Sequence, residues 1–331
     1  MPLPFPEALQ EFKLATSAQD ATQGGGHSGA TVDAVTKSGS NSFHGDLFEF
    51  FRNYNLNGRD FFSPVADGLK RNQFGGVIGG PIKKDKLFFF LGYEGTTVRQ
   101  YNQSTIQYVP TPAELTGNFG PYIAAGCPGA AGIAASPIVH GGHIVVPLSP
   151  AALKISSYLP QSNNVCGQVF SGIPLHENES QAPVRLDYNL SPKHMLFARY
   201  IVTKIDIAQP YSISKNALST DGQGANDESN SLALGDTYLF SANVVNSFRA
   251  FGNRVGATTP GAQTFGPQQV GINNFYDYYG NFIPIFLVAN GFSTNFISNF
   301  SIGSEIWGEV VKSPGEPSVV RELVNFRNPG T

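Results

Sequence analysis

Alternating apolar and polar residues mark several stretches of this chain, and each pair of stretches is separated by a short polar turn. Residues 184–190 are the clearest case, because their apolar side chains fall on every second position. After a turn at 191–194 the alternation resumes over 195–202. The two stretches predict an antiparallel hairpin with one continuous apolar band, formed by Val184, Leu186, Tyr188, Leu190, Leu196, Ala198, Tyr200 and Val202.

Two more hairpins and one leading strand follow from the same pattern. The hairpins are predicted over 72–82 with 87–100, and over 232–240 with 244–255. Residues 43–52 are predicted to be the leading strand. The result is an all-β chain of about seven strands, arranged as an antiparallel meander of long hairpins.

Four glycines, at positions 75, 76, 79 and 80, interrupt one of these strands. Glycine is unfavourable in a strand interior, so we predict a bulged strand here. The segment lacks the Gly-Lys-Ser/Thr ending of a phosphate-binding loop.

The connections between the predicted strands alternate between short and long. About twenty residues join 52 to 72, about eighty join Gln100 to Pro183, and more than twenty join Lys204 to Ser231. Short turns at one end and long loops at the other are typical of bacterial outer-membrane β-barrels. A soluble β-sandwich with long loops is the alternative, and it would cover the apolar band with a second sheet.

Composition and charge narrow the class of protein. Charged residues make up 14% of the chain, against roughly 25% in soluble domains. The net charge of -3 and the absence of a dense Lys/Arg block argue against a nucleic-acid partner. No apolar run is long enough for a transmembrane helix. The first residues lack the basic start and apolar stretch of a signal peptide, which by itself would indicate a cytoplasmic protein.

The stretch 28–53, SGATVDAVTKSGSNSFHGDLFEFFRN, resembles the junction between plug and barrel in TonB-dependent outer-membrane transporters of the Oar-like branch. Asp33-Ala34 departs mildly from that pattern. Residues 3–17, 71–95, 191–200 and 241–256 resemble other parts of the same family in the same order. The family positions at the junction are filled by Gly29, Val32, Val35, Thr36, Lys37, Ser38, Gly39, Phe43, His44 and Gly45.

This resemblance implies a domain organisation. Residues 1–41 would be the C-terminal end of a plug, and 42–331 the first part of a barrel with long extracellular loops. The joint at 37–41 would be a hinge-like crossing, after which phenylalanines face lipid and charged residues face a watery lumen. Such barrels have about 22 strands, so the chain is expected to be an incomplete fragment that is not active alone.

The resemblance also implies a function, which is uptake of a substrate across the outer membrane with energy relayed by TonB. The expected partners are outer-membrane lipid, an unknown substrate, and TonB through an N-terminal part missing from this chain. The protein is not expected to be an enzyme or to bind a cofactor. The alternative is a soluble secreted β-protein that binds a glycan or protein through its long loops.

Candidate chemistry is sparse, and each candidate has a simpler explanation. His140 and His143 could form a metal pair, but two ordinary loop histidines explain them better. An outer-loop calcium site could form from Asp221, Asn226, Asp227 and Glu228, although a solvated loop accounts for them too. Four charged residues could line the lumen and touch plug or substrate, or could equally be ordinary inward-facing polar residues: Glu49, Arg52, Glu94 and Arg99.

The remaining features concern the loops. Cys127 and Cys166 could form a disulfide or remain free thiols. The segment 24–29 is not a nucleophile elbow, because Ala30 stands where that motif needs glycine. A short helix is predicted near 149–158, where Ser149 would be its N-cap. The structure beyond 257 is not predicted.

Overall fold

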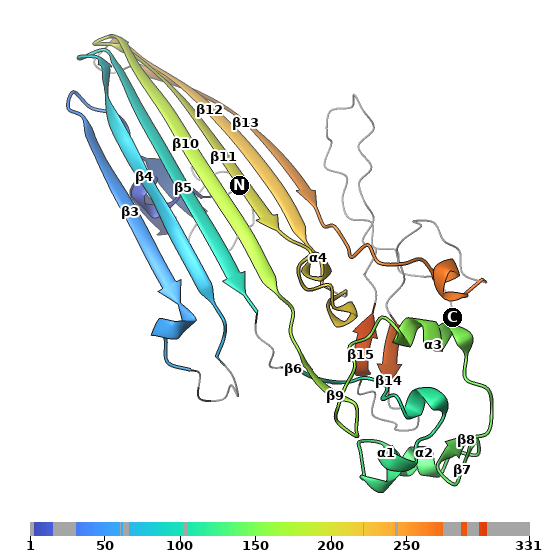
Figure 1. Cartoon of the computed structure of the whole chain (residues 1–331). Coiled ribbons are helices and arrows are strands. Elements are labelled where there is room, and N and C mark those ends of the chain that lie inside the picture. Colours follow the sequence, from blue (N-terminus) through green and yellow to red (C-terminus); the bar gives the residue numbers. More distant parts are fainter. Residues whose placement is uncertain are drawn as a thin grey trace.

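The computed structural model describes residues 3–15, 31–59, 61, 66–101, 105–220, 222–241, 244–273, 286–289 and 298–302. Seven antiparallel strands form one sheet in the order β13-β12-β11-β10-β5-β4-β3 (Figure 1). The strands are β3 His44–Asn53, β4 Lys70–Lys83, β5 Leu87–Gln100, β10 Leu175–Ser191, β11 His194–Ile207, β12 Ala225–Ser241 and β13 Val244–Thr258. The predicted hairpins and the leading strand are therefore confirmed, as is the all-β open sheet.

Several strands extend further toward the long loops than the sequence pattern predicts. β10 begins at Leu175 instead of 184, and β12 begins at Ala225 instead of 232. The added residues are mostly polar on both faces, so the hydrophobic alternation ends although backbone pairing continues. No helix among the described residues is long and apolar enough to span a membrane.

The prediction of a bulge at the four glycines is wrong. Gly75 to Gly80 pair in unbroken register with β5, and the only shift recorded between β4 and β5 lies between Pro81 and Lys83. The glycines instead leave room for rings from β3 and the residue before it. A Cβ atom on Gly75 would lie 2.6 Å from Cζ of Phe48, and one on Gly80 would lie 2.4 Å from Cδ1 of Phe43.

A second, smaller unit lies against one face of the sheet. It comprises a short 3-10 helix, Pro6–Ala8, and two antiparallel strands, β1 Leu9–Ala15 and β2 Thr31–Thr36. We call its described residues, 3–15 and 31–36, the N-terminal segment, and the sheet face that it contacts the inner face. In Figure 1 it lies behind the sheet.

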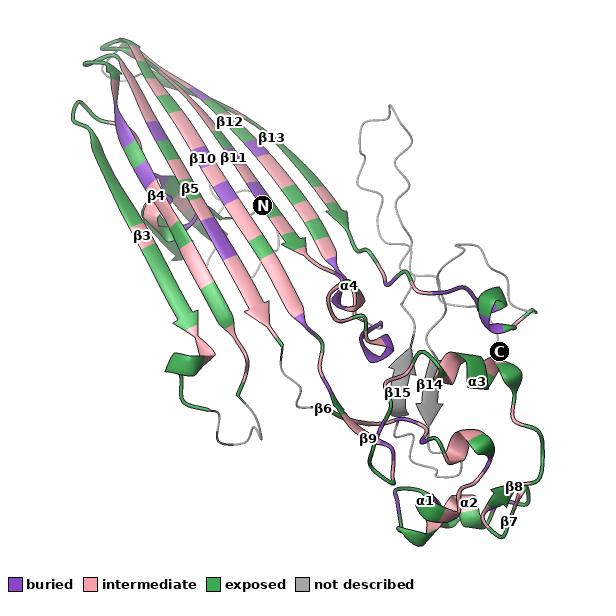
Figure 2. Cartoon of the chain, viewed as in Figure 1, coloured by how far each residue is buried: buried purple, intermediate pink, exposed green. Residues whose placement is uncertain are grey.

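The opposite, outer face carries the predicted apolar band. Because side chains alternate along a strand, the residues of β10 that contact the N-terminal segment leave Val184, Leu186 and Tyr188 on the outer face. Leu186 is 42% exposed. Residues of different burial follow one another along most strands of the sheet (Figure 2). Toward the long loops the outer face turns polar, with Lys204 Nζ 3.5 Å from Glu228 Oε2. The band from β10 and β11 continues on neighbouring strands through Ile78, Leu91, Tyr93, Leu232 and Leu234.

The connections that follow β5, β11 and β13 fold together at one end of the sheet (Figure 1). We call residues 105–174, 208–220 and 259–272 the loop module. Its core joins all three connections, because Val109, Leu218, Phe265 and Val270 pack in one buried cluster. Its elements are β6 Thr105–Tyr108, α1 Gly120–Ala124, α2 Ala130–Ala134, β7 Val139–His140, β8 His143–Ile144, α3 Pro150–Ser156, β9 Gln168–Ser171, α4 Pro210–Ser214 and the 3-10 helices Glu114–Thr116, Ala217–Ser219 and Pro267–Val270.

Two open questions in the loops are resolved. Cys127 and Cys166 form a disulfide, with 5.4 Å between their Cα atoms. The predicted helix is α3, and its N-cap hydroxyl on Ser149 accepts from the backbone N–H of Ala152 at 3.5 Å. Outside the sheet, the N-terminal segment and the loop module, the described elements are the 3-10 helix Tyr54–Leu56 and the hairpin of β14 Phe286–Ala289 with β15 Ser298–Ile302.

Candidate functional site

The N-terminal segment packs on the inner face through a small apolar cluster. Phe5 and Ala8 are buried against Val77 of β4 and Phe90 of β5. Phe48 of β3 packs against this cluster, with its ring centroid 6.0 Å from that of Phe5. Apolar packing therefore connects the segment to three neighbouring strands.

Gln181 of β10 holds the main chain of the segment. Its Oε1 accepts from the backbone N–H of Phe5 at 2.7 Å, and its Nε2 donates to the backbone oxygen of Leu3 at 3.0 Å. Nε2 also donates to Oγ1 of Thr203 on β11 at 3.0 Å, and the Gln181 residue is only 6% exposed. One buried amide side chain thus satisfies a donor and an acceptor of the segment's backbone.

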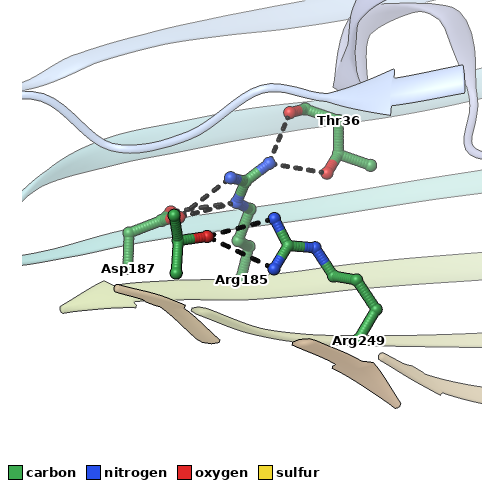
Figure 3. A network of polar contacts seen from close by, with 5 residues as sticks. Thr36, Arg185, Asp187 and Arg249 are labelled. Carbon is green, nitrogen blue, oxygen red and sulfur yellow. Dashed lines mark hydrogen bonds and ion pairs between the residues drawn. The ribbon is translucent and has the colours of Figure 1, made fainter. Parts of the chain in front are cut away.

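Arg185 makes a second attachment four residues further along β10 (Figure 3). Its Nη1 donates to the backbone oxygen of Thr36 at 3.0 Å, and Thr36 is the last residue of β2. Its Nε and Nη2 donate to the carboxylate of Asp187 at 2.8 to 3.1 Å. Asp187 therefore fixes the guanidinium in the orientation that reaches the segment.

A second guanidinium approaches the same part of the inner face. Arg249 of β13 and Arg185 both lie over the ring of Phe197, with Cζ 5.1 Å and 5.4 Å from its centroid. Nη1 of Arg249 donates to Oγ1 of Thr237 at 3.3 Å and to the backbone oxygen of Asp236 at 3.1 Å. Figure 3 shows the two guanidinium groups near each other, with only that of Arg185 joined to Thr36.

The joint between the segment and β3 is tied to a short turn of the sheet. Asn41 Nδ2 donates to Oδ1 of Asp85 at 2.6 Å, and the backbone N–H of Asp85 donates to Oδ1 of Asn41 at 2.8 Å. At Gly39 a Cβ atom would lie 2.3 Å from the backbone oxygen of Phe89. The predicted hinge-like crossing is therefore packed against the β4–β5 hairpin.

The predicted separation of phenylalanines and charges after this joint is only partly correct. Phe48 and Phe50 lie on the inner face, in contact with each other and, for Phe48, with Phe5. Glu49, between them, lies on the outer face. The reason is the two-residue period of the strand, which places Phe48 and Glu49 on opposite sides.

The four residues expected to line the lumen are likewise divided. Glu94 is on the inner face, where its Oε2 accepts from Gln73 Nε2 at 2.9 Å, and Arg52 shares that face. Glu49 and Arg99 lie on the outer face, and Arg99 donates to Oδ1 of Asn178 at 2.6 Å. Glu49 and Arg52 are three residues apart on β3, and Glu94 and Arg99 are five apart on β5. An odd separation on a regular strand places the two side chains on opposite faces.

The structure pairs the two candidate histidines but places no third potential metal ligand with them in the described part of the chain. His140 and His143 face each other across the β7–β8 hairpin, and no cluster of three or more potential ligands occurs within the described part of the chain. Asp227 and Glu228 are adjacent in β12 and point to opposite faces. Asp221 and the segment 24–29 lie outside the described residues.

A cavity of about 230 Å³ lies in the loop module, where no sequence pattern predicts one. Its lining residues include three aromatic ones, Tyr108, Phe119 and Tyr122, and the acidic residue Glu114. The hydroxyl of Tyr122 donates to the backbone oxygen of Pro128 at 2.6 Å. Burial, and then the negative charge of Glu114, raises the pKa of Tyr122. Irregular loops carry no periodic signal from which such a cavity could be predicted.

Comparison with known proteins identifies the family of the sheet. The profile of the family described as outer membrane beta barrel domain matches residues 35–308. The TonB-dependent transporter Oar of Myxococcus xanthus is 37% identical over 109 residues, which are 30% of this chain and 10% of the transporter. No solved structure matches the chain. The predicted outer-membrane location is thereby confirmed over the soluble secreted alternative, and the chain belongs to the outer membrane β-barrel domain family.

Proposed function

We propose that this chain is part of a TonB-dependent receptor that takes up a substrate across the outer membrane. In this proposal residues 1–41 are the C-terminal end of the plug, and 42–331 are the first part of the barrel wall. The similarity to Oar, itself a TonB-dependent transporter, supports the assignment. So does the sheet, because β3 and β13 are each paired on one side only in the described structure, which leaves room for further wall strands.

The observation that carries the proposal is the attachment of the N-terminal segment to the inner face. A plug end should lie inside the wall and should be held by contacts that can open. Gln181 and Arg185 hold backbone groups of the segment, and the apolar cluster around Phe5 is small. Hydrogen bonds of this kind contribute roughly 0.5–3 kcal/mol each, so a pulling force relayed by TonB could release them.

Thr203 offers a direct test, because it is 4% exposed and lies beneath the segment next to Gln181. We would replace it with cysteine, Thr203→Cys, in the gene in its native host and follow labelling by a small maleimide. Energised cells should label this cysteine faster than cells that lack TonB. Thr116→Cys, on the exposed surface of the loop module, should label at the same rate in both strains. Equal labelling of the buried cysteine with and without TonB would contradict the proposed function.

A further inference from the structure

The cavity in the loop module is built by elements that the disulfide and the shared core hold in place. Its wall comes from the end of β6, the 3-10 helix at Glu114, α1 and α3, and Cys166 also contributes to it. Tyr158, just after α3, stacks on Phe265 with 4.2 Å between ring centroids. The cavity is therefore supported by packing from the connection that follows β13 as well as by its own loop.

The carboxylate of Glu114 is fixed in this wall. Its Oε2 accepts from the backbone N–H of Thr111 at 2.7 Å and from Oγ1 of Thr111 at 2.8 Å. Within the described residues no donor reaches Oε1. The orientation of the carboxylate is thus set by one oxygen, while the other oxygen is available to a ligand.

The aromatic side chains complement this negative charge. The hydroxyl of Tyr122 is already engaged by Pro128, so its ring contributes mainly an apolar face. Tyr108 and Phe119 supply two more rings in the same wall, and Leu153 adds aliphatic surface. A carboxylate beside aromatic faces favours a cation, because both the charge and the ring quadrupoles attract it.

We propose that this cavity binds a small organic ammonium compound, with the ammonium beside Glu114 and an apolar body against Tyr108, Phe119 and Leu153. The volume of about 230 Å³ is below the roughly 300–1,000 Å³ of sites for drug-sized ligands, which limits the body to one ring or a short alkyl chain. The inference rests on the proposed function in one respect, since a receptor would present this cavity on its ligand-accepting side.

The test compares two probes of the same shape, phenethylammonium and neutral 2-phenylethanol, on the full chain in detergent micelles. Ligand-observed NMR titration gives a Kd for each probe. Wild-type protein should bind phenethylammonium at least about tenfold more tightly than the alcohol. Glu114→Gln should remove this preference while its amide oxygen still accepts from Thr111. Glu49→Gln, on the outer face of β3, is the matched control and should keep the preference.

A second variant keeps the test decisive if Glu114→Gln disturbs the loops. Leu153→Trp fills the cavity and should abolish binding of both probes. Equal Kd values for the two probes in wild-type protein would overturn the proposal, as would unchanged phenethylammonium binding in either cavity variant. The outcome is independent of TonB: probe binding with no TonB-dependent labelling of Thr203→Cys would retain the cavity and refute the uptake role.

Discussion

Replacing Gln181 with alanine should loosen the N-terminal segment without unfolding the sheet. The change removes two hydrogen bonds to the segment, of which one leaves the backbone N–H of Phe5 without its partner. It also removes the bond to Thr203, which lies within the sheet and does not affect detachment. Leaving a buried donor unsatisfied costs about 1–3 kcal/mol, and each lost neutral hydrogen bond costs about 0.5–1.5 kcal/mol. We therefore expect the free energy of detaching the segment to fall by about 2–4 kcal/mol.

Hydrogen exchange measures this free energy locally. A fall of about 2 kcal/mol corresponds to roughly thirtyfold faster exchange when the segment detaches before its amides exchange. The amides to follow are those of Ala8, bonded to the oxygen of Phe5, and Lys37, bonded to the oxygen of Ala8. Peptides from β11 should show no change, because the seven-stranded sheet keeps its ladder.

A matched variant separates this effect from a general loss of stability. Gln73 is another inner-face glutamine, and its amide bonds Glu94 rather than the segment. Gln73→Ala should leave exchange at Ala8 and Lys37 unchanged. Gln181 does not hold the segment if Gln181→Ala leaves it as protected as in wild-type protein, or if the variant accelerates exchange equally in β11.

Two further predictions address the loops and the outer face. The double variant Cys127→Ser/Cys166→Ser should destabilise the loop module by about 2–4 kcal/mol, because the disulfide closes a loop with a sequence separation of 39 residues. Limited proteolysis should then cut the module while the sheet stays intact. An unchanged digest would contradict this prediction. Leu186→Arg should cost about 2–4 kcal/mol if this position faces lipid near the bilayer centre. The folded fraction in liposomes should fall for this variant and not for Thr97→Arg, which lies on the outer face beyond the apolar band.

The sheet could be predicted from sequence because burial on one face leaves a two-residue period. That period identified the hairpins around 184–202 and 232–255, and it ended where both faces became polar, at the start of β10 and β12. The same period, applied residue by residue, would have separated Phe48 from Glu49 and Arg52 from Glu49.

The candidate site could be predicted much less well. Gln181 and Arg185 occupy inner-face positions, where a polar residue is equally compatible with contact to water or to another chain segment. Gln181 bonds the backbone of the N-terminal segment only because the fold places Phe5 beside it, 176 residues away in sequence. The cavity near Glu114 depends on three loops that share one core, and no periodic pattern in a single loop reports such packing.

We expect the outer face of the sheet to contact lipid, while the inner face holds the N-terminal segment. Spin labels placed one at a time on residues 183–190 of the chain in liposomes test it most directly, by their collision rates with oxygen and with a water-soluble nickel complex. We predict a two-residue alternation, with oxygen favoured at Leu186 and Tyr188 and excluded at Arg185 and Asp187. Equal access of the nickel complex to Leu186 and Arg185, or an alternation of opposite phase, would contradict it.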